Sequence, residues 1–338
     1  RYHARDSAIF LSGLHKSKTL LGSATPSLES YFNAVTNKYG LVTLNKRYGN
    51  VDLPKIIIND LRESFSKKMM IGNFSKILLN NIKKTIDNEE QVILFQNRRG
   101  HSPYLECSSC GFVYQCINCD VSLTYHQATN QLKCHHCGYK EQNNTKCKKC
   151  ANNTILKRGI GTQQVEEDIK TIFPDLIVKR MDHDSTRKKN SLQKIISAFE
   201  NNDFEILVGT QMLTKGLDFK NVSLVGVINA DSLIYFPDFR SQEKCFQLLQ
   251  QVAGRSGRSK EQGRVVIQTY NPKHDLINKI VKNDYLGMFN EQLNQRLTFN
   301  YPPYTRLIKI TLKNKDLNKL IKSSNWLSEA LRNRFKSQ

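Results

Sequence analysis

Apolar residues recur along the chain in short continuous runs separated by stretches of helical spacing, a pattern typical of strands that alternate with helices. Apolar positions at helical spacing predict a helix over 74–86, and the run Val92–Phe95 then predicts a buried parallel strand. The same alternation predicts further helices near 164–172, 191–199 and 246–252, and strands at 177–178, 206–208, 224–228 and 264–268. The fold class is therefore α/β, with a mostly parallel sheet that binds ligands at the carboxyl ends of its strands.

The two ends of the chain have weaker patterns. The N-terminal part predicts a strand at 19–21, a turn at 22–26, a helix that starts near Ser27, and short β-like runs at 42–44 and 56–58. The tail changes character at Tyr301–Tyr304, after which one strand (307–312) and one basic helix are expected. These last elements are too few for a domain, so they are interpreted as the start of an α+β C-terminal domain.

The chain is strongly basic, with 51 Lys and Arg against 30 Asp and Glu in 338 residues and a formal net charge of +21. Such an excess favours a polyanionic partner, because it steers association and neutralises phosphates. A solvated surface, or a genome that favours Lys and Asn codons, is the alternative explanation. No run of about 18 apolar residues exists, so no membrane contact is expected. The opening on Arg1 rather than Met, with no apolar leader, suggests a fragment without a secretory signal.

Eight of the nine cysteines form four Cys-x-x-Cys pairs. A two-residue spacer lets both sulfurs of a pair face one tetrahedral ion, and two pairs complete a closed site whose role is structural. The sequence thus predicts two zinc ions, with iron–sulfur as the rival, and disulfides are disfavoured in a reducing compartment. The spacing leaves open whether the pairs combine in a nested or a sequential way. The predicted ligands are Cys107, Cys110, Cys116, Cys119, Cys134, Cys137, Cys147 and Cys150.

Histidines 126, 135 and 136 lie near these cysteines and are interpreted as bystanders, because eight thiols already fill two sites. Cys245 stands alone in an apolar helical stretch, so we expect it to be a core residue.

A glycine-bearing turn follows the strand expected at 206–208. Gly209 and Gly216 let backbone N–H groups approach an anion, and Thr210 and Gln211 can donate to a backbone phosphate. Asp218 is suited to accept from a ribose hydroxyl or to order an arginine. A strand followed by a turn with glycine occurs in many α/β folds, so this motif is only moderately specific.

A sharper motif follows the helix expected at 246–252. Arg255 and Arg258 are three residues apart and are separated by small residues, in the segment that begins Gln251-Val-Ala-Gly254. Two guanidinium groups placed in this way suit a phosphoryl group that gains charge in its transition state. The alternative is an exposed basic helix end.

Arg98 lies in a third basic segment, Asn97–Gly100, directly after an expected strand and shortly before Tyr104. Basic residues beside an aromatic side chain suit a nucleic-acid backbone with stacked bases. A solvated loop would give the same pattern, so the segment is weak evidence alone.

These motifs together resemble a known family. The segment Leu21–Pro26 resembles motif III of superfamily 2 helicases, Thr210–Phe219 resembles motif V, and Gln251–Arg258 resembles motif VI with its arginine finger. The four cysteine knuckles narrow the resemblance to the primosomal replication-restart DNA helicases, the PriA family. The segments Arg1–Asp6 and Asp238–Ser241 are similar to that family as well, so the likeness covers nearly the whole chain.

The resemblance implies a RecA-like helicase lobe with an inserted double zinc module. It also implies site residues: Arg255 and Arg258 at the ATP γ-phosphate, with Arg258 as the finger; Gly216, Asp218, Gln251 and Gly254 at the nucleotide cleft; and Arg98, Thr210 and Gln211 on DNA. The family nests its zinc sites, which implies one ion on the outer two pairs and one on the inner two. It further implies a bacterial cytoplasmic protein at replication forks that uses ATP and Mg²⁺ and unwinds branched DNA 3′→5′. The implied partners are branched and single-stranded DNA, primosome and helicase-loading proteins, and single-stranded DNA-binding protein.

One departure from the family matters for activity. The sequence contains no G-x-x-x-x-G-K-[ST] phosphate loop and no DEEH box, so we expect this chain by itself not to hydrolyse ATP. The predicted organisation is the end of motor lobe one (1–65), lobe two (66–105 and 152–290), the zinc module (106–151) and the start of a C-terminal domain (298–338). The alternatives are a zinc-ribbon nucleic-acid-binding module without motor activity and, third, a zinc-stabilised docking scaffold.

Overall fold

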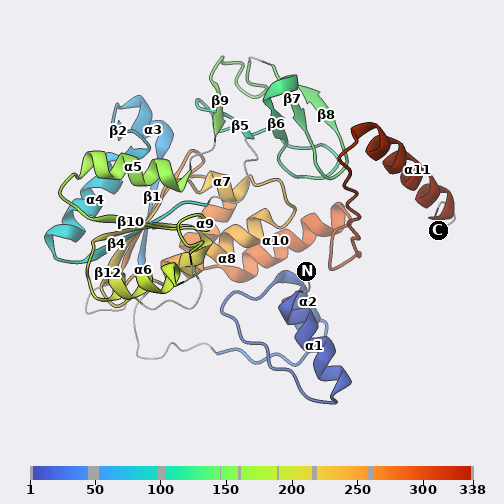
Figure 1. Cartoon of the computed structure of the whole chain (residues 1–338), viewed down its shortest axis with the longest axis horizontal. Coiled ribbons are helices and arrows are strands. Elements are labelled where there is room, and N and C mark those ends of the chain that lie inside the picture. The colour runs from blue at the N-terminus through green and yellow to red at the C-terminus, as the bar shows by residue number, and fades with distance from the viewer. Residues whose placement is uncertain are drawn as a thin grey trace.

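A six-stranded parallel sheet forms the centre of the protein (Figure 1). The computed structural model describes residues 3–44, 53–97, 104–144, 146–158, 161–188, 190–214, 219–257 and 262–335. The strand order is β1-β13-β12-β4-β11-β10, and every neighbouring pair is parallel, which confirms the predicted α/β class. The strands are β1 (Lys55–Asp60), β4 (Gln91–Phe95), β10 (Val178–Met181), β11 (Ile206–Gly209), β12 (Val222–Val227) and β13 (Arg264–Thr269).

Helices cover both faces of this sheet. Alternate residues of a strand point to opposite faces, so Val92 and Leu94 of β4 pack in one apolar cluster while Ile93 and Phe95 pack in the other. The first face is covered by α4 (Lys76–Asp87) and α5 (Thr162–Ile172). The second face is covered by α6 (Ser191–Glu200), α8 (Ser241–Ala253), α9 (Asp275–Val281) and α10 (Tyr285–Thr298).

Short elements connect these layers. They are α3 (Leu61–Ser66), the hairpin of β2 (Met70–Ile71) and β3 (Phe74–Ser75), α7 (Asp231–Ile234) and the 3₁₀ turn η3 (Gln211–Thr214), whereas the 3₁₀ turn η2 (Gln127–Thr129) lies in the cysteine-rich insertion.

The cysteine-rich insertion leaves the sheet after β4 and lies above it in the view of Figure 1. An antiparallel pair closes its base, formed by β5 (Tyr104–Cys107) and β9 (Ile155–Arg158). Within it, β6 (Thr124–His126), β7 (Gln131–Lys133) and β8 (Lys140–Gln142) form a three-stranded antiparallel sheet. The whole insertion from 104 to 158 is called the cysteine module below.

The N-terminal part contains α1 (Ala4–Leu14) and α2 (Leu28–Val35). Ser27 caps α2 by accepting a hydrogen bond from the N–H of Ser30, so the expected helix start is confirmed. The strands expected at 19–21 and 42–44 are wrong: both segments are irregular, and Leu20 is 96% exposed. Neither segment pairs with a strand among the described residues, and a strand without a neighbour lacks partners for its backbone groups.

The run at 56–58 does form a strand, β1, but β1 pairs with β13 at the edge of the central sheet. The predicted division near residue 65 separates this strand from β13, its partner in the sheet. The other proposed boundaries stay predictions.

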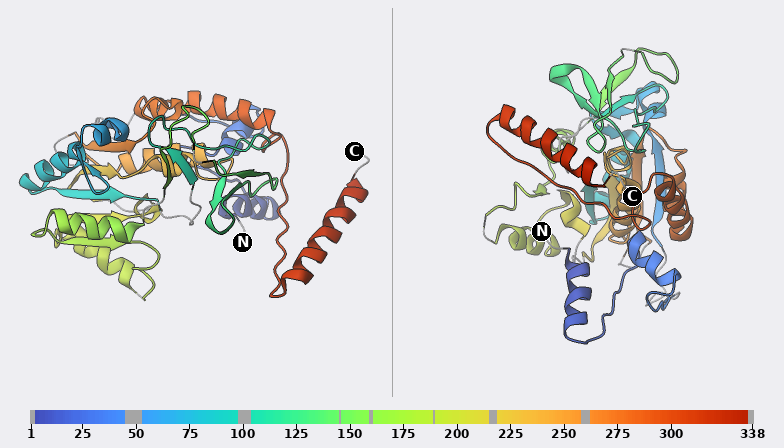
Figure 2. Two further views of the ribbon diagram at one scale, coloured as in Figure 1. Left: turned by 90° about the horizontal axis from the view of Figure 1, so that it is seen from above. Right: turned by 90° about the vertical axis from the view of Figure 1, so that its right-hand side faces the viewer.

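The C-terminal helix α11 (Leu317–Phe335) stands away from the body of the protein (Figure 2). It has no buried residue, and the basic helix is confirmed. The strand expected at 307–312 is wrong: Ile308 is 89% exposed and the segment is irregular. As in the N-terminal part, no sheet neighbour lies beside it among the described residues. All helices in the described parts of the chain are too short or too polar to span a bilayer.

Candidate functional site

The eight paired cysteines gather into two groups of four. Cys107, Cys110, Cys147 and Cys150 form the outer group; Cys116, Cys119, Cys134 and Cys137 form the inner group, and within each group all sulfur atoms lie within 4.8 Å of one another. This is the nested arrangement, which the spacing left open and the family resemblance implied.

The four knuckles share one backbone geometry. In each, the N–H of the residue after the second cysteine donates to the carbonyl of the first, at 2.8–3.1 Å. That following residue is left-handed in every knuckle, with φ of 71° at Gly111, 49° at Asp120, 78° at Gly138 and 59° at Ala151. The turn directs both sulfurs of a pair toward one point. Glycine suits two of these positions because it has no Cβ to strain.

The sulfur distances fit zinc. The Sγ atoms of Cys107 and Cys150 are 3.6 Å apart, those of Cys110 and Cys147 3.7 Å, and those of Cys116 and Cys137 3.5 Å. A tetrahedral ion with Zn–S bonds of about 2.3 Å requires sulfurs about 3.8 Å apart. The two Cys₄ groups are therefore consistent with two structural zinc ions.

One thiol in each group has a lowered pKa. Burial raises the pKa of Cys107, but hydrogen bonds from Thr154 and from nearby backbone N–H groups outweigh it and hold the pKa at about 6. In the inner group, a hydrogen bond from the backbone of Tyr139 is the main cause that lowers the pKa of Cys137 to about 6. Burial raises the pKa of Cys110 to about 12 and of Cys116 to about 11. Zinc binding should therefore release several protons per site.

The remaining candidates near the cysteines are outside both groups. Both metal groups found among the described residues consist of cysteines alone. The rings of His126 and His135 instead pack against each other, 5.2 Å apart. Cys245 is fully buried in the sheet core on α8, as expected.

The turn after β11 lies at the carboxyl edge of the sheet, as predicted. Thr210 and Gln211 follow β11 directly, and the Gln211 amide donates to the side-chain oxygen of Asn97, which follows the neighbouring strand β4, at 3.5 Å. Gly209 lets the turn pack closely, since a Cβ there would lie 2.7 Å from the Leu213 side chain and 2.9 Å from the carbonyl oxygen of Met181. Arg98 lies outside the described residues.

The arginine segment lies at the opposite edge. Gly257, two residues after Arg255, donates its N–H to the carbonyl of Val222, the first residue of β12. A Cβ at Gly257 would lie 2.2 Å from the backbone nitrogen of Gly263, just before β13, so the chain is closely packed there. Gln251 is exposed, and Gly254 and Arg255 are half-buried.

The expectation that all ligands meet at the carboxyl ends of the strands is therefore wrong for this segment. Parallel strands β12 and β13 run the same way, so the helix between them must return to the amino end. α8 has 13 residues, about 20 Å of helix, which matches the roughly 20 Å height of a six-residue strand. The structure thus separates the residues proposed for DNA from the arginine segment. Gly216, Asp218 and Arg258 lie outside the described residues.

Two buried aspartates at the carboxyl edge were missed from the sequence. Asp182, after β10, is 1% exposed and accepts from the hydroxyl of Thr162 at 2.6 Å and from Arg180 at 3.1 Å. Asp231, fully buried, accepts from the Thr269 hydroxyl at 3.0 Å and from the N–H of Tyr270 at 2.8 Å. Asp182 thus links the start of α5 to the end of β10, and Asp231 links the start of α7 to the end of β13. The only available signal was an acidic residue shortly after an apolar run.

The N-terminal turn that resembles motif III is held by two helices of the second face. The carbonyl of Pro26 accepts from the side chain of Gln247 on α8 at 3.2 Å and from the hydroxyl of Tyr285 on α10 at 3.0 Å. Leu28, fully buried, packs in the core that α8 also covers. This turn and the helix that leads to Arg255 are therefore in direct contact.

Two family models match parts of the chain. The "PriA DNA helicase Cys-rich region (CRR) domain" matches residues 116–142, which include the inner cysteine group, and the "Helicase conserved C-terminal domain" matches residues 161–260.

Curated relatives match over most of the chain. The replication restart protein PriA of Bacillus subtilis is 43% identical over 322 residues, covering 94% of this chain and 40% of the relative. The protein of the same name from Haemophilus influenzae is 42% identical, covering 94% of this chain and 43% of the relative. This chain thus spans less than half the length of these two relatives. Among solved structures, yeast Dbp5 bound to RNA and ADP BeF₃ is 13% identical with a TM-score of 0.39, covering 95% of this chain and 58% of that one. A likeness this weak adds nothing to the family relation.

Proposed function

Since this chain belongs to the PriA family of replication restart proteins, we propose that it supplies the second motor lobe and the zinc module of an ATP-dependent DNA helicase. The longer protein would recognise stalled or branched forks, unwind them 3′→5′ and restart replication through primosome assembly. Its proposed partners are branched and single-stranded DNA, helicase-loading proteins and single-stranded DNA-binding protein. This chain alone, without a phosphate loop, is expected not to hydrolyse ATP.

One observation carries the proposal: a helicase C-terminal region at 161–260 and the cysteine-rich region of PriA at 116–142 occur together in one chain. The helicase region alone would not distinguish a restart helicase from other helicases, and the cysteine-rich region supplies that distinction. Identity of 43% over 94% of the chain supports the same conclusion.

The two edges of the sheet suggest a division of labour. Thr210 and Gln211 at the carboxyl edge would donate hydrogen bonds to DNA phosphates, together with Arg98. Arg255 and Arg258 would stabilise charge on the γ-phosphate, with Gln251, Gly254, Gly216 and Asp218 around the nucleotide. Mg²⁺ bound with ATP would neutralise phosphate charge, and the structural zinc ions would hold the module's shape.

The motor assignment is tested by single substitutions in the full-length protein. Arg258→Ala and Arg255→Ala should lower ATP hydrolysis, by about 10³-fold or more for the finger, while DNA affinity changes little. Arg187→Ala is the matched control, because this arginine is 68% exposed and pairs with Asp184 at the surface. Unchanged ATP turnover in both test variants would refute the motor role and favour a zinc-ribbon nucleic-acid-binding module.

The excess of positive charge favours DNA contact over the docking-scaffold alternative. Lys and Arg contacts to phosphate release counterions, so the logarithm of DNA affinity should fall steeply and linearly with the logarithm of salt concentration. An affinity nearly independent of salt would favour the scaffold.

A further inference from the structure

Two arginines and two glutamates form a cluster of ion pairs that is buried at Arg296 and Glu243 and partly exposed at Arg240. Arg296 of α10 is 1% exposed and pairs with Glu243 of α8 at 2.5 Å and with Glu29 of α2 at 3.2 Å. Arg240, just before α8, pairs with the same oxygen of Glu29 at 2.8 Å. The cluster therefore joins three helices that are far apart in the sequence. Breaking a buried pair of this kind is costly because it leaves a charge without a partner.

The electrostatics of the two carboxylates differ. Burial raises the pKa of Glu29, but Arg240 and Arg296 outweigh it, so this pKa is lowered. Burial raises the pKa of Glu243, and Arg296 offsets only part of that effect. Glu29 thus lies between two arginines, whereas Glu243 pairs with Arg296.

The cluster extends to the cysteine module through aromatic rings. The ring of Phe239 lies against the guanidinium groups of Arg240 and Arg296. The distances from the ring centre to the Cζ atoms are 4.2 Å for Arg240 and 5.3 Å for Arg296. The other neighbour of Phe239 is Tyr301, stacked at 4.3 Å with an angle of 8° between the rings. The Tyr301 hydroxyl donates to the backbone carbonyl of Cys119 at 2.8 Å, and this bond is buried.

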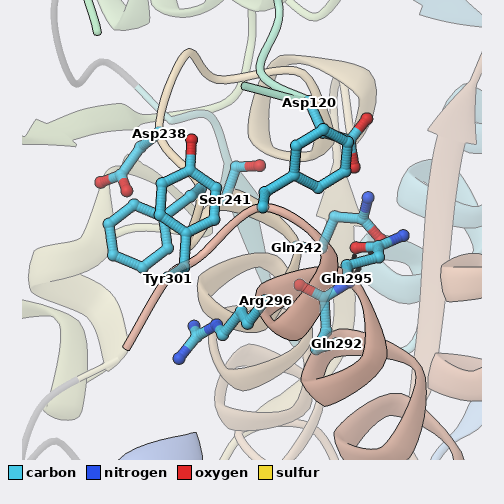
Figure 3. Close-up of a pocket in the computed structure, with 10 residues that line it drawn as sticks. Asp120, Asp238, Ser241, Gln242, Gln292, Gln295, Arg296 and Tyr301 are labelled. Atoms are coloured by element: carbon cyan, nitrogen blue, oxygen red, sulfur yellow. Dashed lines mark hydrogen bonds between the residues drawn. The ribbon is translucent and has the colours of Figure 1, made fainter. Parts of the chain in front are cut away.

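Cys119 belongs to the inner cysteine group, so Tyr301 holds the backbone of a predicted zinc ligand. Figure 3 shows Tyr301 beside Arg296, with Asp120 of the same knuckle at the opposite wall of a small pocket. Gln242 of α8, and Gln292 and Gln295 of α10, line that pocket as well. Asp120 therefore faces the same pocket as side chains of these two helices.

At its other end the cluster reaches the turn that resembles motif III and the arginine segment. Glu243 accepts from the backbone N–H of Leu28 at 3.0 Å, and the same helix, α8, runs on to Gln251 and Arg255. A continuous series of contacts thus joins the inner metal group to α8. The link reaches the inner group through the backbone carbonyl of Cys119, which accepts from Tyr301.

We propose that Tyr301, Phe239 and Arg296 are positioning residues that couple the inner zinc site to helix α8. A displacement of α8 changes the support of Cys119 and so the retention of the inner zinc, and the metal in turn holds α8 in place, because coupling between two sites is reciprocal. In the motor of the proposed function, this contact links the zinc module to the arginine segment. The coupling itself is a property of this chain and requires no ATP hydrolysis.

The test measures zinc loss to a coloured chelator from the chain loaded with two zinc ions. Tyr301→Phe removes one hydroxyl and keeps the stacked ring, so one of the two zinc ions should leave roughly threefold faster or more, and the other at the original rate. Tyr125→Phe is the matched control: it removes an exposed hydroxyl bonded to Asn130 in the same module, and should change neither rate.

The decisive comparison uses a residue that does not touch the module. Glu243→Gln on α8 should also speed loss of the inner zinc, and combining it with Tyr301→Phe should give less than the product of the two effects. Glu63→Gln, an exposed carboxylate on α3, is the control. If Glu243→Gln fails to fold, Glu29→Gln replaces it, because the Glu29 side chain is less buried than that of Glu243 and its loss leaves Arg296 paired with Glu243.

The proposal would be overturned if Glu243→Gln did not change the rate of zinc loss. It would also be overturned if the effects of Tyr301→Phe and Glu243→Gln on that rate simply multiplied, because Tyr301 would then act by local packing alone. In the full-length protein, Mg²⁺–ADP should alter the inner zinc-loss rate, and Tyr301→Phe should abolish that response. If the arginine variants retained ATP turnover while the substitutions in the chain still showed coupling, the proposed function would fail and the inference would stand.

Discussion

The central sheet and the cysteine module are stabilised in different ways. Strands β4, β11 and β12 are buried along their whole length, with fully buried Ile93, Leu94, Leu207 and Val225. The module has a smaller apolar cluster built on Leu105, Tyr114, Val121, Leu123 and Leu132, to which three cysteines of the inner group contribute. The module's short strands, three or four residues long, bury too little surface to be stable without additional links.

Burial of apolar area therefore holds the sheet, and metal ligation is expected to hold the module. The difference shows that one chain can carry two units whose stability responds to different chemistry. The comparison can be tested by perturbing either the module or the sheet and measuring the effect on both.

The largest effect is expected from loss of a zinc ligand. Cys116→Ser should remove one zinc per chain and unfold the inner half of the module, because a closed Cys₄ site contributes on the order of 10 kcal/mol. The newly reactive thiols should be Cys119, Cys134 and Cys137, as the nested groups require. Metal analysis and thiol mapping by mass spectrometry check this. Reactivity at Cys107 and Cys110 instead would indicate sequential pairing.

A core substitution should have the complementary effect. Leu94→Ala removes a fully buried side chain between α4 and the sheet, and should lower the free energy of unfolding by about 2–5 kcal/mol. Zinc content should stay at two per chain. Chemical denaturation monitors the sheet and metal analysis monitors the module; a parallel loss of zinc would show that the two units are not separately stabilised.

Smaller effects are expected at the left-handed knuckle positions. Gly111→Ala places a Cβ at φ 71° and 3.1 Å from the carbonyl oxygen of Tyr270, so it should destabilise the module. Ala151→Gly relieves the same conformation in another knuckle and should stabilise it by about 1 kcal/mol. The midpoint of zinc-dependent unfolding measures both, and equal shifts of the same sign would contradict the geometry.

The smallest effect concerns Cys245, which should remain unreactive toward thiol reagents after zinc is removed, whereas the eight paired cysteines become reactive. Burial in the sheet core raises its pKa, so little thiolate forms. Labelling of Cys245 at the rate of the others would mean that the sheet opens when the module does.

Some of this architecture could be predicted from the sequence, because the signals are local. Cysteine spacing predicts tetrahedral sites, and continuous apolar runs such as 92–95 predict buried parallel strands. The place of each element in the fold depends on non-local contacts and is harder to predict. The run at 56–58 gives no sign that it pairs with β13, and the runs at 19–21 and 307–312 have no neighbour among the described residues.

The candidate site shows the same limit. Thr210 and Gln211 lie where a turn after a parallel strand must lie, but the arginine segment lies at the opposite edge because α8 returns across the sheet. Nested pairing, the buried aspartates and the bond from Tyr301 to Cys119 all join residues distant in sequence, up to 182 positions apart in the last case. No short-range pattern contains that information.

Amide hydrogen exchange before and after removal of zinc tests most directly whether the two units have separate sources of stability. Protection should disappear between residues 104 and 158, fall modestly near Tyr301, and remain in β4, β11, β12 and β13. Loss of protection throughout those four strands on zinc removal would contradict the account, because it would mean that the metal ions stabilise the sheet itself.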